Sequence, residues 1–136
     1  MADNTIIDKV LVHLQGYVLE SKVDKDDLTD LDYDKKISSY EILTFYEIAS
    51  SYALSYLNRT EFPTRLKKVE NSEVEVIDPI VNDALCMWTA GKIWQKYNVR
   101  VNNNEDDTNT LGYGDKLVIQ AKEMLKPYKY FNMKVY

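Results

Sequence analysis

The residues best suited to chemistry lie in one acidic stretch, residues 30–41. This stretch has nearly the donor order of a twelve-residue EF-hand calcium loop. The six expected ligands, at loop positions 1, 3, 5, 7, 9 and 12, are Asp30, Asp32, Asp34, Lys36, Ser38 and Glu41. Lys36 would contribute its backbone carbonyl, and Glu41 both carboxylate oxygens. Calcium prefers such oxygen ligands, and on this interpretation the chain would be a calcium-binding, EF-hand-like interaction module. Otherwise no cofactor is expected.

The same residues have a second interpretation. Lys35 stands where the EF-hand loop has glycine. A side chain there is costly at positive φ, and the ammonium group would repel the ion. The alternative is an acidic, solvated loop that leads into a capped helix. Ser38 would then be the N-cap, and Glu41 would be the acid of a capping box rather than a calcium ligand.

Catalytic patterns find little support in this sequence. The chain has one histidine, His13, and one cysteine, Cys86, which excludes the common zinc sites. Cys86 lies in an apolar run and is expected to be buried, without a second histidine to activate it. The glycines at 112 and 114 lack the spacing of a phosphate-binding loop. We therefore expect no enzymatic activity.

The formal net charge of −5 is unevenly distributed. Lys126, Lys129 and Lys134 place three positive charges near the end, so residues 1–125 carry −8. Binding to duplex DNA normally requires clustered lysine and arginine, so tight DNA binding is not expected. No apolar run approaches the roughly 20 residues that span a bilayer, and the start lacks the features of a signal peptide, so no membrane partner is expected.

Hydrophobic periodicity predicts four helices, at about residues 3–15, 38–58, 79–97 and 115–126. Asp78 and Pro79 have the residue types of a helix start, and Pro127 ends the last helix. The alternation Glu73-Val-Glu-Val76 predicts a short strand or hairpin. The predicted fold is mainly α, a compact bundle of about four helices with this hairpin and an extended C-terminal tail.

The last ten residues differ from the rest in composition. They combine six apolar or aromatic side chains with two lysines and no acid, which favours a strap laid on a neighbouring protein. The expected partner-binding residues are Tyr128, Lys129, Tyr130, Phe131, Met133, Lys134, Val135 and Tyr136. We divide the chain into a helical domain, residues 1–126, and an interaction tail, residues 127–136. The alternative is a tail folded back over its own core.

The order of these parts resembles the head-tail connector proteins of tailed bacteriophages, also called adaptor or head-completion proteins. The long helix over about residues 38–58 ends at Arg59-Thr-Glu-Phe62, and residues 49–62 look like the helix end and Arg-x-x-Phe-like break of that family. An alanine-bearing helix follows Asp78-Pro79, and then come a variable loop, a glycine-rich turn, a short helix and a tail. The resemblance covers residues 38–136.

The resemblance implies a structural protein of the virion. Its helical domain would assemble, in the host cytoplasm, into a ring of commonly twelve copies beneath the portal, at the neck between head and tail. The implied partners are the portal protein, a stopper or tail-completion protein, and further copies of the chain. Viral DNA would pass through the ring without tight binding. The acids expected to line the lumen are Asp24, Asp26, Asp27, Glu105, Asp106 and Asp107.

Overall fold

Helices dominate the computed structural model, which describes residues 2–19, 36–98 and 112–130. In chain order the elements are α1 (Ala2–His13), β1 (Val18–Leu19), β2 (Lys36–Ile37), α2 (Ser39–Leu57), β3 (Thr64–Val69), β4 (Ser72–Ile77), α3 (Pro79–Tyr97), α4 (Tyr113–Leu125) and the short 3-10 helix η5 (Lys126–Tyr128). The prediction of a mainly α bundle of four helices is confirmed. The expected hairpin is also present, as β3 and β4.

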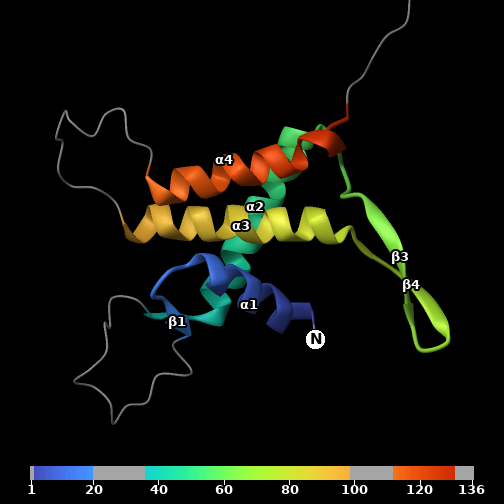
Figure 1. The fold of residues 1–136 in the computed structure, drawn as a ribbon, viewed down its shortest axis with the longest axis horizontal. Helices are drawn as coiled ribbons and strands as arrows, with labels where there is room; N and C mark the ends of the chain where they lie inside the picture. The colour runs from blue at the N-terminus through green and yellow to red at the C-terminus, as the bar shows by residue number, and fades with distance from the viewer. Residues whose placement is uncertain (1, 20–35, 99–111, 131–136) are drawn as a thin grey trace, which may run out of the picture.

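The four helices form one packed body (Figure 1). Helices α3 and α4 lie side by side in opposite directions, and α2 runs across them. Helix α1 packs mainly on α3, and the two-residue strands β1 and β2 pair in parallel beside it. The β3–β4 hairpin projects away from this body.

The helix starts follow from local capping. Ser38 Oγ accepts a hydrogen bond from the backbone N–H of Glu41 at 3.1 Å, and so caps α2. Asp78 Oδ1 accepts one from Ile80 N at 3.0 Å, with Pro79 in the first turn of α3. Helix α2 ends at Asn58, whose left-handed conformation (φ 57°, ψ 42°) is a common helix stop.

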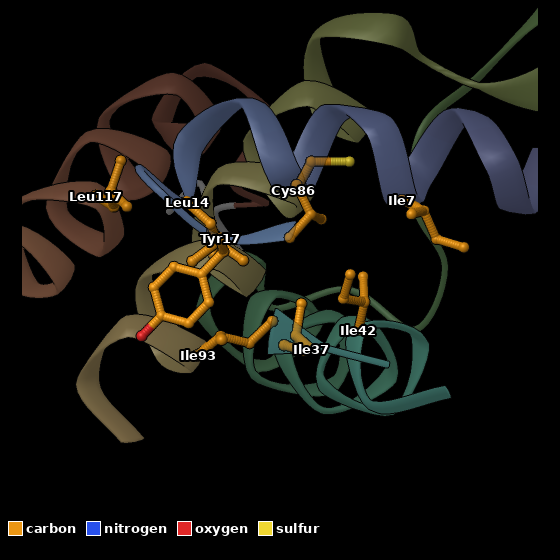
Figure 2. Close-up of a cluster of buried hydrophobic side chains, with 10 residues drawn as sticks. Ile7, Leu14, Tyr17, Ile37, Ile42, Cys86, Ile93 and Leu117 are labelled. Carbon is orange, nitrogen blue, oxygen red and sulfur yellow. The ribbon is translucent and has the colours of Figure 1, made fainter. Parts of the chain in front are cut away.

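Two hydrophobic clusters form the core, and α3 contributes to both. Figure 2 shows the first, where α1, α2, α3 and α4 meet; its buried members are Ile7, Val10, Leu14, Tyr17, Ile37, Ile42, Cys86, Ala90, Ile93 and Leu117. The second cluster consists of Ala49, Ala53, Leu57, Val81, Ala84, Leu85, Trp88, Val118, Ala121 and Leu125. Because α3 has neighbours on several sides, nearly all of its middle turns are buried.

Helices α3 and α4 meet at a pair of glycines. A Cβ atom on Gly91 would lie 2.7 Å from the carbonyl oxygen of Gly114, and a Cβ on Gly114 would lie 2.7 Å from the oxygen of Gly91. Both distances are too short for a real contact, so any side chain at either position would push the helices apart. Gly91 and Gly114 together thus allow α3 and α4 to approach closely.

The hairpin has a two-residue turn. Strand β3 pairs with β4 in antiparallel register from Thr64 opposite Ile77 to Val69 opposite Ser72. Glu70 begins the turn with a positive φ of 56°. The backbone N–H of Asp78 donates to Pro63 O at 3.0 Å and closes the base of the hairpin.

Candidate assembly interface

One end of the helical body gathers several chain segments. We call it the hairpin end and define it as residues 57–63, Asp78 and residues 126–130. Here α2 ends, the hairpin leaves and returns, α3 begins and η5 finishes (Figure 1). A surface pocket of about 320 Å³ lies at this end, lined by Asn58, Arg59, Thr60, Glu61 and Tyr130.

The first residues of the predicted tail lie on the domain itself. Tyr130 N donates to Leu57 O at 2.8 Å, and Arg59 Nε donates to Tyr128 O at 2.7 Å. The hydroxyl of Tyr128 donates to Asp78 Oδ1 at 3.3 Å. Burial raises the pKa of the Tyr128 phenol, and the negative charge of Asp78 raises it further. Residues 127–130 therefore fold back on their own domain, as in the second interpretation of the tail.

Because of these contacts, a tail free of the domain could begin only after Tyr130. The predicted division between residues 126 and 127 falls inside η5, so residues up to Tyr130 pack as part of the helical body. Lys129 Nζ also lies 4.7 Å from the centre of the Tyr56 ring, a cation–π contact. Five predicted partner-binding residues lie outside the described residues, and their role stays a prediction: Phe131, Met133, Lys134, Val135 and Tyr136.

The hairpin exposes nearly all of its side chains. Every residue of β3 is exposed, and so are the first four of β4. Leu66 is 63% exposed, although leucine is usually buried, and Val69 and Val74 are exposed as well. Strand β3 carries three basic residues, whereas β4 carries two acidic ones, Glu73 and Glu75. The hairpin thus has a basic strand beside an acidic strand.

A second exposed apolar surface lies along α2. Tyr40, Ile48 and Tyr52 follow one side of the helix and are 80%, 42% and 57% exposed. Lys92 Nζ lies 5.6 Å from the centre of the Tyr52 ring. Helix α2 thus has two apolar sides. In the structure one side packs into the core, and this side is open.

The C-terminal end of α3, opposite the hairpin end, lies beside the flanks of two acidic segments. These segments are residues 20–35 and residues 99–111. Pairing of β1 with β2 brings the flanks of residues 20–35 together. Tyr17 accepts a hydrogen bond from Asn98 Nδ2 at 3.0 Å, and Tyr113 OH donates to His13 O at 2.7 Å. The flanks of residues 99–111 therefore lie at this same end. The expected lumen acids, Asp24, Asp26, Asp27, Glu105, Asp106 and Asp107, lie outside the described residues, and their role stays a prediction.

Three of the six predicted calcium ligands are described. Lys36 lies in β2, and Ser38 caps α2. The carboxylate of Glu41 does not complete a capping box; it accepts hydrogen bonds from Lys96 Nζ at 2.8 Å and from the Tyr97 hydroxyl. Burial alone would raise the pKa of Glu41, but these two hydrogen bonds and the charge of Lys96 outweigh it, and the pKa is lowered.

Bidentate binding of calcium by Glu41 would use Oε2, the oxygen that accepts both of these hydrogen bonds. The other predicted ligands, Asp30, Asp32 and Asp34, lie outside the described residues. Within the parts of the chain that are described, no group of three or more His, Cys, Asp or Glu residues could hold a metal ion. Calcium binding by residues 30–41 stays a prediction.

The structure brings His13 and Cys86 to one pocket, which their separation in the sequence does not predict. This pocket of about 290 Å³ is lined by Lys9, Val12, His13, Asp83, Cys86, Met87 and Met124. Burial raises the pKa of the Cys86 thiol to about 12 and lowers that of His13. A neutral, buried thiol is a poor nucleophile. Asp83 forms an ion pair with Lys9 at 2.6 Å.

Comparison with known proteins gives no relative. No protein-family model, curated protein or solved structure matches the chain. Within residues 2–19, 36–98 and 112–130, no helix combines the length and the hydropathy needed to cross a bilayer.

Proposed function

We propose that this chain is a structural assembly protein, the connector between the head and the tail of a tailed virus. It would act as a subunit of a ring beneath the portal, with the portal protein and a stopper or tail-completion protein as its partners. The proposal joins the sequence resemblance to one structural observation, the hairpin that projects from the helical body.

The hairpin supports an assembly role because a two-stranded hairpin without a partner has little stability of its own. A two-stranded hairpin is marginally stable in water, and its open edges are templates for pairing with another chain. Here the strands pair only with each other, among the described residues, and their side chains are largely exposed. A surface of this kind becomes stable and useful when a partner covers it.

The separation of surfaces along α3 also suits a connector. The hairpin and the start of the tail leave from one end, and both acidic segments leave from the other. A subunit that links two assemblies needs distinct contact surfaces. The acidic segments, whose flanking residues lie at the end away from the basic strand, are our candidates for the lumen, where acid would keep passing DNA from binding.

The test is capture of partners from cells infected by the virus that encodes the chain. Two tagged versions would be compared, the full chain and a chain ending at Tyr130. The shorter chain keeps the contacts of Tyr128 and Tyr130 with the domain, so its fold should be unchanged, which thermal unfolding would verify. Mass spectrometry should identify a portal or tail-completion protein with the full chain only.

The same experiment can contradict each part of the proposal. Capture of the portal by both versions would show that residues 131–136 are not the contact. A full chain that binds neither a portal nor a tail-completion protein, in a lysate that contains both, would overturn the connector function.

A further inference from the structure

The two edges of the β3–β4 hairpin carry opposite charges. Strand β3 contains Arg65, Lys67 and Lys68, and β4 contains Glu73 and Glu75. We propose that copies of this chain join hairpin to hairpin, with β3 of one copy paired to β4 of the next. This inference rests on the proposed function, because it names the contact by which subunits of the ring meet.

The register of the hairpin identifies the backbone groups available for this pairing. Residues of an antiparallel pair alternate between opposite positions that bond to each other and positions that point outward. The bond from Asp78 N to Pro63 O places the odd-numbered residues of β3 in the bonded set. The N–H groups of Leu66 and Lys68 on β3, and of Glu73 and Glu75 on β4, therefore point to the outer edges.

Charge decides which edges meet. In a symmetric dimer β3 would pair with β3, or β4 with β4, and like charges would face each other across the new contact. Like charges at directly opposite positions destabilise a strand pair, whereas opposite charges stabilise it. Lysines on an edge strand also discourage pairing with a like strand. The acidic strand β4 is thus the matching edge for β3.

The chain directions agree with this choice. If neighbouring copies are related by rotation about a ring axis, β3 of one copy lies antiparallel to β4 of the next, and both hairpins keep the same face on the same side. One face then joins Lys68 of one copy to the glutamates of its neighbour. The other face joins Arg65 and Lys67, through their aliphatic stems, to Val74 and Val76.

A contact of this type is heterologous, which means that each copy uses two different surfaces. Such contacts generate closed rings or open filaments, whereas a symmetric contact stops at a dimer. Each strand has six residues, about 20 Å of pairing, so one hairpin contact should be weak. Closing a ring would satisfy the edges of every copy together.

The first test is self-association of the full chain, followed by sedimentation velocity at low salt from about 10 μM to about 1 mM. Leu66→Pro removes an outward N–H and leaves the bonds inside the hairpin in place. Leu66→Thr is the matched control, since it also removes the exposed leucine but keeps the N–H. We expect wild type and Leu66→Thr to associate, and Leu66→Pro to associate at least tenfold more weakly.

The second test is a charge exchange. Lys68→Glu makes both strands acidic at this face, and Glu73→Lys places a lysine opposite Lys68 and leaves Glu75 as the only acid of β4, so each variant alone should associate more weakly than wild type. An equimolar mixture of the two variants should associate again, because the acid introduced at position 68 of one chain faces the base introduced at position 73 of the other. The chain that carries both substitutions should associate by itself. It also restores an opposite-charge pair within its own hairpin, because positions 68 and 73 lie opposite each other.

The outcomes separate this inference from the proposed function. A wild-type chain that stays monomeric up to about 1 mM, or a Leu66→Pro chain that associates as well as wild type, overturns hairpin pairing. Failure of the charge-exchanged mixture to associate overturns the heterologous arrangement. Capture of the portal by the full chain in any of these cases leaves the connector function standing.

Discussion

Replacing Gly91 by alanine should destabilise the chain, although alanine is the better helix former. Gly91 lies in α3 where the helix meets α4, and a Cβ there would lie 2.7 Å from Gly114 O and 2.8 Å from Val118 Cγ2. Its third neighbour, Leu117 Cβ, is 3.2 Å away. The first is a backbone atom of α4, so side-chain rotation cannot remove the clash. The two helices would have to separate.

The size of the effect follows from these distances. Ordinary contact begins at about 3.4 Å, so the backbones of α3 and α4 must part by about 0.7 Å at Gly91. Overpacking of a tight core costs about 1–3 kcal/mol, and contact with backbone favours the upper end. The higher helix propensity of alanine returns about 1 kcal/mol. The expected net loss is about 2 kcal/mol, or about 8 °C in melting temperature for a chain of this size.

The measurement is thermal and urea unfolding of Gly91→Ala, Gly114→Ala and a matched control, Gly112→Ala. A Cβ on Gly112 would meet only Asp115 Oδ2, at 3.9 Å, so the control should lose roughly half a kcal/mol, from its N-cap position. The double variant at 91 and 114 should lose less than the sum, because helices already parted accept the second side chain. An unchanged or higher melting temperature for Gly91→Ala would refute the close approach of α3 and α4.

Three further predictions concern single residues. Glu70→Gly should slow hydrogen exchange of the hairpin amides, because the φ of 56° at Glu70 costs a residue with a side chain roughly 1 kcal/mol; unchanged exchange would contradict this. The free energy of unfolding should decrease as the pH is lowered below 4.5. The pKa of Glu41 is lower in the folded chain than its unfolded pKa of 4.5, so its ionised carboxylate stabilises the fold above pH 4.5, and this stabilisation is lost as the pH falls through the folded pKa. Glu41→Gln should lack that part of the pH slope, and an identical slope in both chains would exclude the Lys96 and Tyr97 bonds as its cause. Cys86 should resist alkylation at about pH 8 until the chain opens, because it is buried with a pKa of about 12; rapid labelling of the native chain would disprove this burial.

Local signals in the sequence predicted the helix starts, since a cap depends on residues two or three positions away. Ser38 and Asp78 cap their helices as expected. Glu41 shows the limit of this reasoning. The capping-box pattern assigns its carboxylate to the backbone nearby, but Lys96 and Tyr97, 55 and 56 residues later, take it in the folded chain. Spacing in the sequence carries no signal for such a pair.

The hairpin shows the same division between local and distant information. The alternation around Val74 and Val76 predicted the strand pair, because alternation is a property of neighbouring residues. That the hairpin projects from the body depends on how α2 and α3 pack against each other, which neighbouring residues do not reveal. Docking of Tyr128 on Asp78 and Arg59 likewise joins residues 50 and 69 positions apart, so composition alone favoured a free tail.

The attachment of the chain end has a mechanical consequence. A pull on the tail beyond Tyr130 acts first on the hydrogen bond to Leu57 and on the bond from Arg59 to Tyr128. The hydroxyl of Tyr128 then passes the load to Asp78, which caps α3 and closes the base of the hairpin. Tension applied to the tail would therefore reach the projecting hairpin by a short route at one end of the subunit, in addition to the path along the backbone into α4.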